Sequence, residues 1–221
     1  MAVVHRTTLT PSKLDLLTAW LPTRAWYVGG GEPRLARAGG FRLDDPEGEV
    51  GLEFMVVTDI APAEPVTYFV PLTYRGAPLE DAEHAQIGTM EHGVLGRRWA
   101  YDGAHDPVSV AELLALIEGR AQAQAQGVSD TPDHDVTRAF AGGVSVAEEF
   151  AAVKVLDDES GTELVTPSGA ALRLRRVLST APDAGSDPAH PIGEVGGIWL
   201  RADGSTARGR FAVLSGGADA G

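Results

Sequence analysis

The stretch Leu21-Pro22-Thr23-Arg24-Ala25-Trp26-Tyr27-Val28-Gly29-Gly30-Gly31 follows a short amphipathic segment near the N-terminus. In that segment Leu14, Leu17 and Leu21 recur at the spacing of one helix face, which predicts a short helix. Pro22 disfavours the helical conformation of the residue before it, so we expect the helix to end at Leu21. The three consecutive glycines then predict a break in regular structure.

Capping signals mark the predicted helix ends. Thr10 can act as the N-cap of the first helix, with Pro11 at the first helical position. Asp106 and Pro107 repeat this pattern before an apolar stripe, and Gly119 can end the second helix. We therefore predict one helix after Thr10 and another from Asp106 to Gly119.

Between these helices the pattern is that of β-strands, because β-branched and aromatic residues form short runs separated by turn residues. The predicted strands lie within Glu49–Ile60, Val66–Tyr74, Gln86–Glu91 and Leu95–Tyr101. Pro71 lies inside the second run and has no N–H to donate, so it predicts an edge position or a bulge.

A second β-rich region follows a patch of alternating alanine and glutamine at residues 121–126. Its predicted strands lie within Val144–Leu156, Glu163–Val165, Leu172–Leu178, Gly197–Arg201 and Arg210–Leu214. This pattern divides the chain into a domain of residues 1–120, a linker of residues 121–135, a β-rich extension of residues 136–215 and a disordered tail of residues 216–221.

The composition is that of an acidic globular protein, with a formal net charge of −13 and a sequence pI of about 4.8. Such a surface disfavours nucleic acid and anionic membranes as partners. The absence of cysteine excludes disulfides, thiolate zinc sites and a cysteine nucleophile. No apolar run approaches the roughly 20 residues of a membrane span, and no signal peptide is evident, so we expect a cytoplasmic protein without a membrane partner.

Several segments, in the same order, resemble the N-terminal cap domain of bacterial maltokinases. They are the helix ending in Leu21-Pro22 with Trp26-Tyr27 after it, a strand ending near Val57, the run Thr67-Tyr68-Phe69-Val70-Pro71-Leu72, Ile87-Gly88-Thr89, and Trp99-Ala100-Tyr101-Asp102-Gly103-Ala104-His105-Asp106-Pro107. The resemblance covers about Leu14 to Ile117. It implies an α+β fold, in which a curved antiparallel β-sheet is flanked by helices as a cystatin-like cap, and the second β-rich region adds a smaller C-terminal extension.

In maltokinases the cap precedes the lobes that transfer the phosphoryl group, and that chemistry needs a catalytic Asp and metal-binding acidic or amide groups. This sequence contains no H-G-D loop, no D-[FW]-[ED] metal motif and no phosphate-binding G-x-x-x-x-G-K-[ST] loop. We therefore expect a stand-alone, non-catalytic relative of the cap, a binding or regulatory module connected to sugar or α-glucan metabolism. No catalytic residue, metal or cofactor is predicted.

Aromatic side chains can stack on sugars or anchor an interface, although they also serve as core residues. The predicted ligand-binding residues are Trp26, Tyr27, Trp99, Tyr101 and His105. His105 lies close in sequence to Asp102 and Asp106, which favours either a general acid–base cluster or, more simply, a turn former and a helix N-cap.

A metal site is also conceivable, but the residues that could form it have no ligand spacing typical of zinc, so we do not predict one. These residues are His84, Glu91, His92 and His105.

Two other function classes stay open. The chain could be a small-molecule-binding protein or an enzyme that uses the concave face of the curved sheet, marked by a pocket with Trp or Tyr and a carboxylate or His of shifted pKa. It could instead be an accessory subunit of a separately encoded kinase or glucan enzyme, marked by an exposed apolar patch. A homodimer would expose the same kind of patch, so the patch alone does not separate the two.

Overall fold

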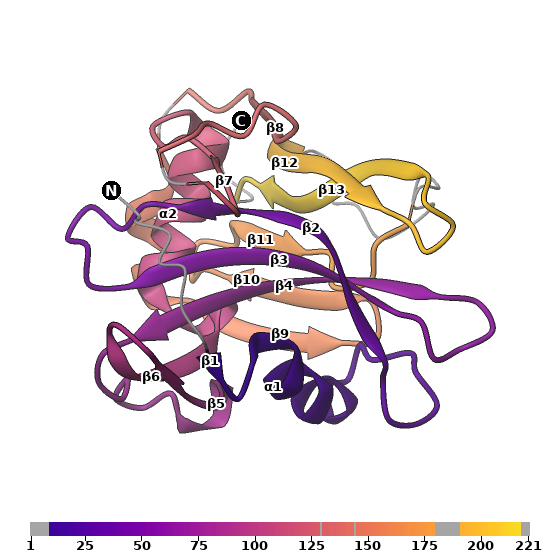
Figure 1. Ribbon diagram of the computed structural model, residues 1–221. Coiled ribbons are helices and arrows are strands. Elements are labelled where there is room, and N and C mark those ends of the chain that lie inside the picture. Colours follow the sequence, from indigo (N-terminus) through magenta and orange to yellow (C-terminus); the bar gives the residue numbers. More distant parts are fainter. Residues whose placement is uncertain (1–8, 129, 144, 180–190, 218–221) are drawn as a thin grey trace.

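A computed structural model describes residues 9–128, 130–143, 145–179 and 191–217 (Figure 1). In chain order the strands are β1 (Leu9–Thr10), β2 (Leu35–Leu43), β3 (Gly51–Asp59), β4 (Val66–Arg75), β5 (Gln86–His92), β6 (Gly96–Asp102), β7 (Gln124–Ala125), β8 (Thr137–Phe140), β9 (Lys154–Asp158), β10 (Gly161–Val165), β11 (Ala171–Leu174), β12 (Pro191–Leu200) and β13 (Thr206–Ser215). The helices are α1 (Lys13–Trp20), α2 (Pro107–Glu118) and four 3-10 turns, η1 (Leu21–Thr23), η2 (Glu83–Ala85), η3 (Gly103–His105) and η4 (Ala147–Ala152).

The described strands form one curved, antiparallel sheet in the order β1-β5-β6-β4-β3-β2-β12-β13-β11-β10-β9. β7 pairs with β2, and β8 pairs with β12. The two β-rich regions of the sequence are therefore parts of the same sheet, joined where β2 meets β12. The predicted α+β class is confirmed, and the likeness to cystatin stays a prediction.

The sheet also curls back on itself. After β11 the chain runs against β4, where Tyr68 bridges to Val177, the Phe69 N–H donates to the Arg176 carbonyl at 2.9 Å, and the Leu178 N–H donates to the Thr67 carbonyl at 2.8 Å. The C-terminal strands thus contact the N-terminal region on two sides. Figure 1 shows the result as two layers, with β9 to β11 behind β3 and β4 and α1 in front.

Pro71 sits in this inner strand, so the prediction of an edge position or a bulge is wrong. β4 pairs with β3 through Pro71 without a register shift, opposite Phe54. The other edge of β4 differs on the two sides of Pro71. Before it, the Phe69 N–H donates to the Arg176 carbonyl, and after it, pairing with β6 begins at Leu72 and Asp102. Because none of the described strands pairs with β4 in that interval, the missing N–H of Pro71 costs no ladder hydrogen bond there.

Four phenylalanines fill the space between the two layers. Phe41, Phe54, Phe69 and Phe211 form a closed ring of contacts. Neighbouring ring centroids in it lie 4.7 to 6.2 Å apart. All four side chains are buried, and aromatic side chains of this size dominate the apolar area of a core. The main core therefore draws on both β-rich regions, with α2 packed against the same cluster.

The first helix covers the opposite face of the sheet. Leu17, Trp20 and Leu21 pack with Trp26 against a strip of β3 and β4 side chains, which are Met55, Val57, Tyr68, Val70 and Leu72. The expected start of this helix is wrong: its N-cap is Ser12, whose side chain accepts from the Asp15 N–H while Asp15 accepts from the Ser12 N–H. This reciprocal capping box leaves Thr10 in β1, paired with Glu91.

The second helix matches its capping signals. Asp106 caps α2 by accepting from the Val108 N–H at 3.0 Å. Gly119 follows the helix in the left-handed conformation, with φ 83°. The expected strand over Val144–Leu156 is wrong in its first part, where η4 precedes β9.

Part of the predicted linker joins the sheet, since β7 pairs with β2 at Phe41 and Arg42. The predicted tail beyond residue 217 lies outside the described residues. Among the helices that are described, none is both long and apolar enough to cross a membrane.

Candidate functional site

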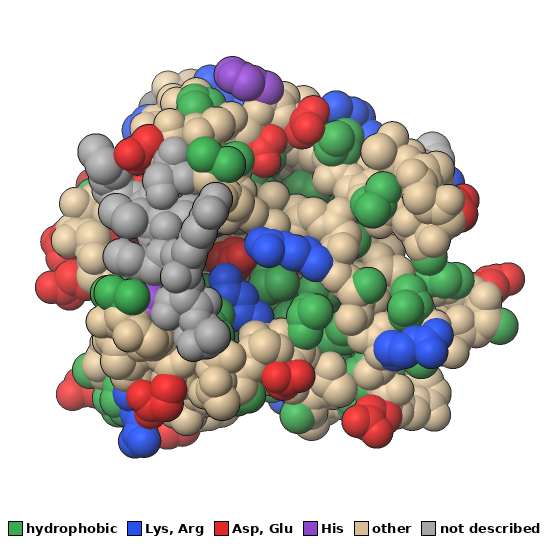
Figure 2. Space-filling model, viewed as in Figure 1, with side chains coloured by type: hydrophobic (Ala, Val, Ile, Leu, Met, Phe, Trp, Pro, Cys, Tyr) green, Lys and Arg blue, Asp and Glu red, His purple; other side chains and the backbone are tan. Residues whose placement is uncertain are grey.

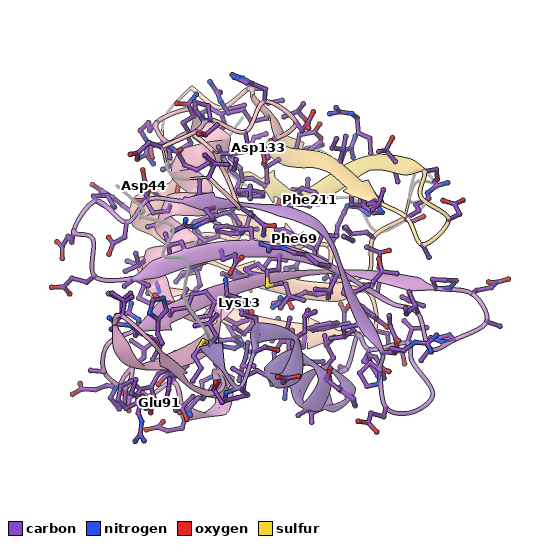
Figure 3. The ribbon with its side chains drawn as sticks, viewed as in Figure 1. Lys13, Asp44, Phe69, Glu91, Asp133 and Phe211 are labelled. Carbon is purple, nitrogen blue, oxygen red and sulfur yellow. The ribbon has the colours of Figure 1, made fainter. Side chains whose placement is uncertain are left out.

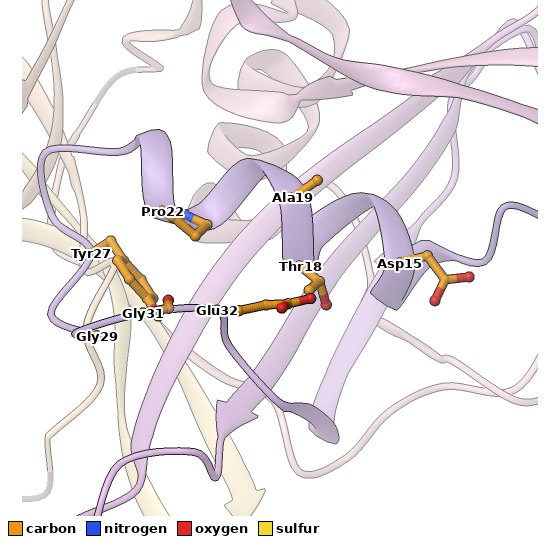
Figure 4. A pocket seen from close by; sticks show the side chains of 8 residues that line it. All are labelled: Asp15, Thr18, Ala19, Pro22, Tyr27, Gly29, Gly31 and Glu32. Atoms are coloured by element: carbon orange, nitrogen blue, oxygen red, sulfur yellow. The ribbon is translucent and has the colours of Figure 1, made fainter.

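A groove of about 730 Å³ runs between α1 and the loop that follows η1 (Figure 4). Its lining residues are Asp15, Thr18, Ala19, Pro22, Tyr27, Gly29, Gly31 and Glu32. Figure 4 shows Tyr27 and Asp15 at opposite ends, with the Glu32 side chain reaching toward Thr18 between them. Two carboxylates, a hydroxyl and an aromatic ring therefore line one shallow depression.

The phenol ring of Tyr27 is held in place at this groove by several contacts. Its hydroxyl lies 3.0 Å from the Gly31 carbonyl and 3.2 Å from the Asp59 carboxylate, and its ring stacks on Tyr68 with centroids 5.8 Å apart. Burial and the neighbouring Asp59 charge raise the pKa of Tyr27 to about 12, so the phenol stays neutral at physiological pH. A Cβ at Gly29 would overlap the Tyr27 hydroxyl, so this loop can pass the ring only as glycine.

Trp26, the neighbouring predicted residue, does not line the groove. Its side chain is fully buried beneath α1, where it makes an edge contact with Trp20 at 5.7 Å. The Arg176 guanidinium lies 5.0 Å from its ring centroid. Trp26 thus supports the groove from below and joins it to the C-terminal strands.

Part of the groove and its supporting strands lie in a segment that is similar to a known family. Residues 20–106 match the family model of the maltokinase N-terminal cap domain. No curated protein matches this chain. The resemblance found in the sequence is thereby confirmed over η1 to β6 and up to Asp106, the N-cap of α2; we call residues 20–106 the cap segment. Five groove residues belong to the cap segment, and Asp15, Thr18 and Ala19 precede it.

The other predicted residues of the cap segment lie at a second place. Tyr101 is buried with Ala82 and Ala85, and its hydroxyl accepts from the Leu79 N–H at 3.0 Å. Trp99 packs half-buried against the same small cluster. The five predicted ligand-binding residues therefore separate into a pair at the groove and a trio at the end of β6.

His105, the third member of that trio, is half-buried and contacts His84, with a distance of 3.1 Å between Nδ1 of His105 and Nε2 of His84. Burial lowers the pKa of His105 despite the opposing charge of Asp102. Within the described residues, no group of three metal-ligating side chains comes together. Glu91 instead pairs with Arg97 at 2.9 Å.

The two aspartates beside His105 are already committed to structural partners. Asp106 accepts two hydrogen bonds of 2.7 Å from Arg75 in addition to capping α2. Asp102 accepts from the Ala104 N–H and pairs at 2.5 Å with Arg176. This geometry favours the reading of both as turn and cap residues over an acid–base cluster.

Sequence reasoning missed most of the groove. Asp15, Thr18 and Glu32 come from two segments with no motif in common, and only their spatial convergence marks them. Tyr27 was predicted because aromatic side chains can stack on sugars. Asp15 could have been noticed as the partner of Ser12 in a capping box.

Proposed function

We propose that this protein is a non-catalytic relative of the maltokinase cap domain that binds a sugar in the groove beside α1. The observation that supports the proposal is the lining of this groove, in which a fixed tyrosine ring at one end shares the depression with the Asp15 and Glu32 carboxylates and the Thr18 hydroxyl. Sugars offer C–H faces to aromatic rings and hydroxyls to carboxylates, so these groups suit a polyhydroxylated ligand. The volume lies within the range of ordinary ligand sites.

The same lining argues against a nucleotide. None of the described residues that line the groove is Lys or Arg, whereas phosphate groups are bound by cations or by clustered N–H donors. The carboxylates would repel a triphosphate. Together with the absent kinase motifs, this supports a role in binding or regulation within sugar or α-glucan metabolism.

The test is isothermal titration of the purified chain with glucose, maltose and maltotriose. We expect saturable binding of at least one of them. Glu32→Gln and Thr18→Val should each weaken it by about tenfold, because a lost hydrogen bond to a charged group costs about 1.5–3 kcal/mol and one to a neutral group costs less. Glu64→Gln, an exposed site in the β3–β4 connection, is the matched control.

Two results would overturn parts of the proposal. Equal weakening by Glu64→Gln, or no binding of any sugar, would remove the sugar site and shift attention to a protein partner or a homodimer. ADP formation that depends on maltose and ATP, in chain freed of contaminating kinases, would remove the non-catalytic role.

A further inference from the structure

A second polar site lies on the same sheet face, between α1 and β7. Its centre is Glu53 of β3, which is 3% exposed. Three cations surround it, and we call Lys13, Arg37 and Arg42 the basic cluster. Figure 3 shows Lys13 over the front of these strands, and Figure 2 shows the middle of this face hollowed, with basic side chains around an acidic one.

The Glu53 carboxylate is held from several directions. Lys13 of α1 pairs with one oxygen, and the Tyr74 hydroxyl donates to the same oxygen at 2.9 Å. Arg37 donates to the other oxygen at 3.1 Å. Burial would raise the pKa of Glu53, but the Lys13 and Arg37 charges outweigh it, so the pKa is lowered and the group is ionised at neutral pH.

Arg42 is not needed for this pairing. It lies directly opposite Glu53 in the β2–β3 register, so the two side chains share one face with their Cβ atoms about 5 Å apart. Nevertheless, Arg42 makes no hydrogen bond or ion pair with any described residue. Arg37 also keeps donors free, since its side chain is 48% exposed and uses Nε and Nη2 for Gln126 and Glu53.

Two glycines lie beside the basic cluster at positions where a side chain would meet its neighbours. Gly40 lies two positions before Arg42 on the same face of β2, and its φ of 113° excludes most other residues. A Cβ there would meet the Gln126 side-chain nitrogen at 2.8 Å. Gly51 pairs with Tyr74, whose ring a Cβ at that position would touch at 3.4 Å. At these two positions the chain therefore carries no side chain that projects toward the basic cluster.

We infer that the basic cluster binds the phosphate group of a small molecule. Three cations around one carboxylate leave two positive charges, which matches the −1.5 to −2 charge of a phosphate monoester near pH 7. Arginine forks bind phosphate oxygens in pairs, and Arg42 has its fork uncommitted. In a chain of net charge −13, such a local excess of cations over acids needs a reason.

Docking of α1 explains only part of this arrangement. The Lys13–Glu53 ion pair connects the helix to β3, and Arg37 donates to the other oxygen of the carboxylate. Neither role uses the donors of the Arg42 guanidinium, so docking of α1 does not account for them. The site is separate from the sugar groove, which contains no cation among its described lining residues.

The experiment is calorimetric titration with inorganic phosphate and with glycerol 3-phosphate, at constant ionic strength balanced with sodium chloride. Wild type should bind at least one of them saturably, and tighter binding of the ester would identify an organic phosphate as the source. Arg42→Gln should weaken binding about tenfold with little change in the melting temperature, because the Arg42 side chain makes no hydrogen bond or ion pair with a described residue. Arg42→Lys should recover part of the affinity by restoring the charge without the fork.

Arg208→Gln is the matched control, because Arg208 is an exposed residue of β13 that makes no hydrogen bond or ion pair with a described residue. It should bind phosphate within about twofold of wild type. Equal loss in Arg208→Gln and Arg42→Gln would show unspecific charge attraction and overturn the proposal. Wild-type affinity in Arg42→Gln, or no saturable binding of either phosphate, would overturn it as well.

Discussion

Replacing Asp102 by asparagine tests whether the pair that Asp102 forms with Arg176 holds the two β-rich regions together. Arg176 is fully buried, donates to Asp102 at 2.5 Å and to Thr162 at 2.7 Å, and packs on the ring of Trp26. Its Nη1 has no partner among the described residues. Among the described residues, the Arg176 charge is therefore compensated by the Asp102 carboxylate.

The magnitude follows from burial. Removing one partner of a buried ion pair costs about 3–5 kcal/mol, because the remaining charge is left uncompensated in a region of low dielectric constant. Asparagine keeps the size of Asp102 and can still accept from the Ala104 N–H, so the change isolates the lost charge. For a chain of this length the expected fall in melting temperature is roughly 6 to 20 °C.

The assay is urea unfolding followed by tryptophan fluorescence, with thermal unfolding by circular dichroism beside it. Glu91→Gln is the control, since the Glu91–Arg97 pair is exposed on both sides and should cost at most about 1 kcal/mol. Arg176→Met combined with Asp102→Asn should cost less than the sum of the two single changes. If Asp102→Asn is no more harmful than Glu91→Gln, the buried pair does not hold the sheet closed and this reasoning fails.

Three further predictions follow from the other buried groups. The pKa of Glu53 is lower in the folded than in the unfolded chain, so the ionised group stabilises the fold above its ordinary pKa, and this stabilisation is lost as pH falls through the folded pKa. Between about pH 3 and 7 the free energy of unfolding, measured in urea, should therefore depend more steeply on pH in wild type than in Glu53→Gln. The pKa of Tyr27 is raised to about 12, so its contribution to the free energy of unfolding is complete below about pH 10 and is lost as pH rises through the folded pKa. Tyr27→Phe should remove one late step from the ultraviolet titration of the phenols. Gly40→Ala should cost about 1–3 kcal/mol in urea unfolding, because its φ is 113° and the new Cβ would lie 2.1 Å from the Phe54 carbonyl oxygen, whereas Gly30→Ala, with open space around it, should change little.

Structural features that depend on a few consecutive residues could be predicted well. Asp106-Pro107 and Gly119 fix both ends of α2, because a cap acts within one turn of its own helix. The run of β-branched and aromatic residues at Val66–Tyr74 predicted β4, which extends to Arg75. The predicted start of α1 was wrong although a cap is an equally local feature. Thr10 and Ser12 are both good N-cap residues, and because Thr10 pairs with β5, Ser12 caps the helix.

The candidate sites were less visible because strand register cannot be read from one strand. Glu53 stands in the apolar run of β3 and looks like a solvated side chain until β2 places Arg42 opposite it. Lys13 comes from a helix 40 residues away. Tyr27 could be named in advance because the aromatic residue itself was the signal, whereas the basic cluster is defined only by contacts between segments.

The aspartates of the cap segment show what local reasoning leaves out. Asp102 and Asp106 were interpreted as a turn former and an N-cap, and each does accept a backbone N–H in that role. Each also neutralises a distant arginine, Arg176 and Arg75 respectively. In Asp102 the two roles use different oxygens, since Oδ1 accepts from the Ala104 N–H and Oδ2 binds Arg176, 74 residues away. In Asp106 the capping oxygen Oδ1 also accepts from Arg75, 31 residues away, because a carboxylate oxygen can accept more than one hydrogen bond. The same residues thus end local elements and hold distant strands together, which is why the acidic composition of the chain does not reveal which charges are structural.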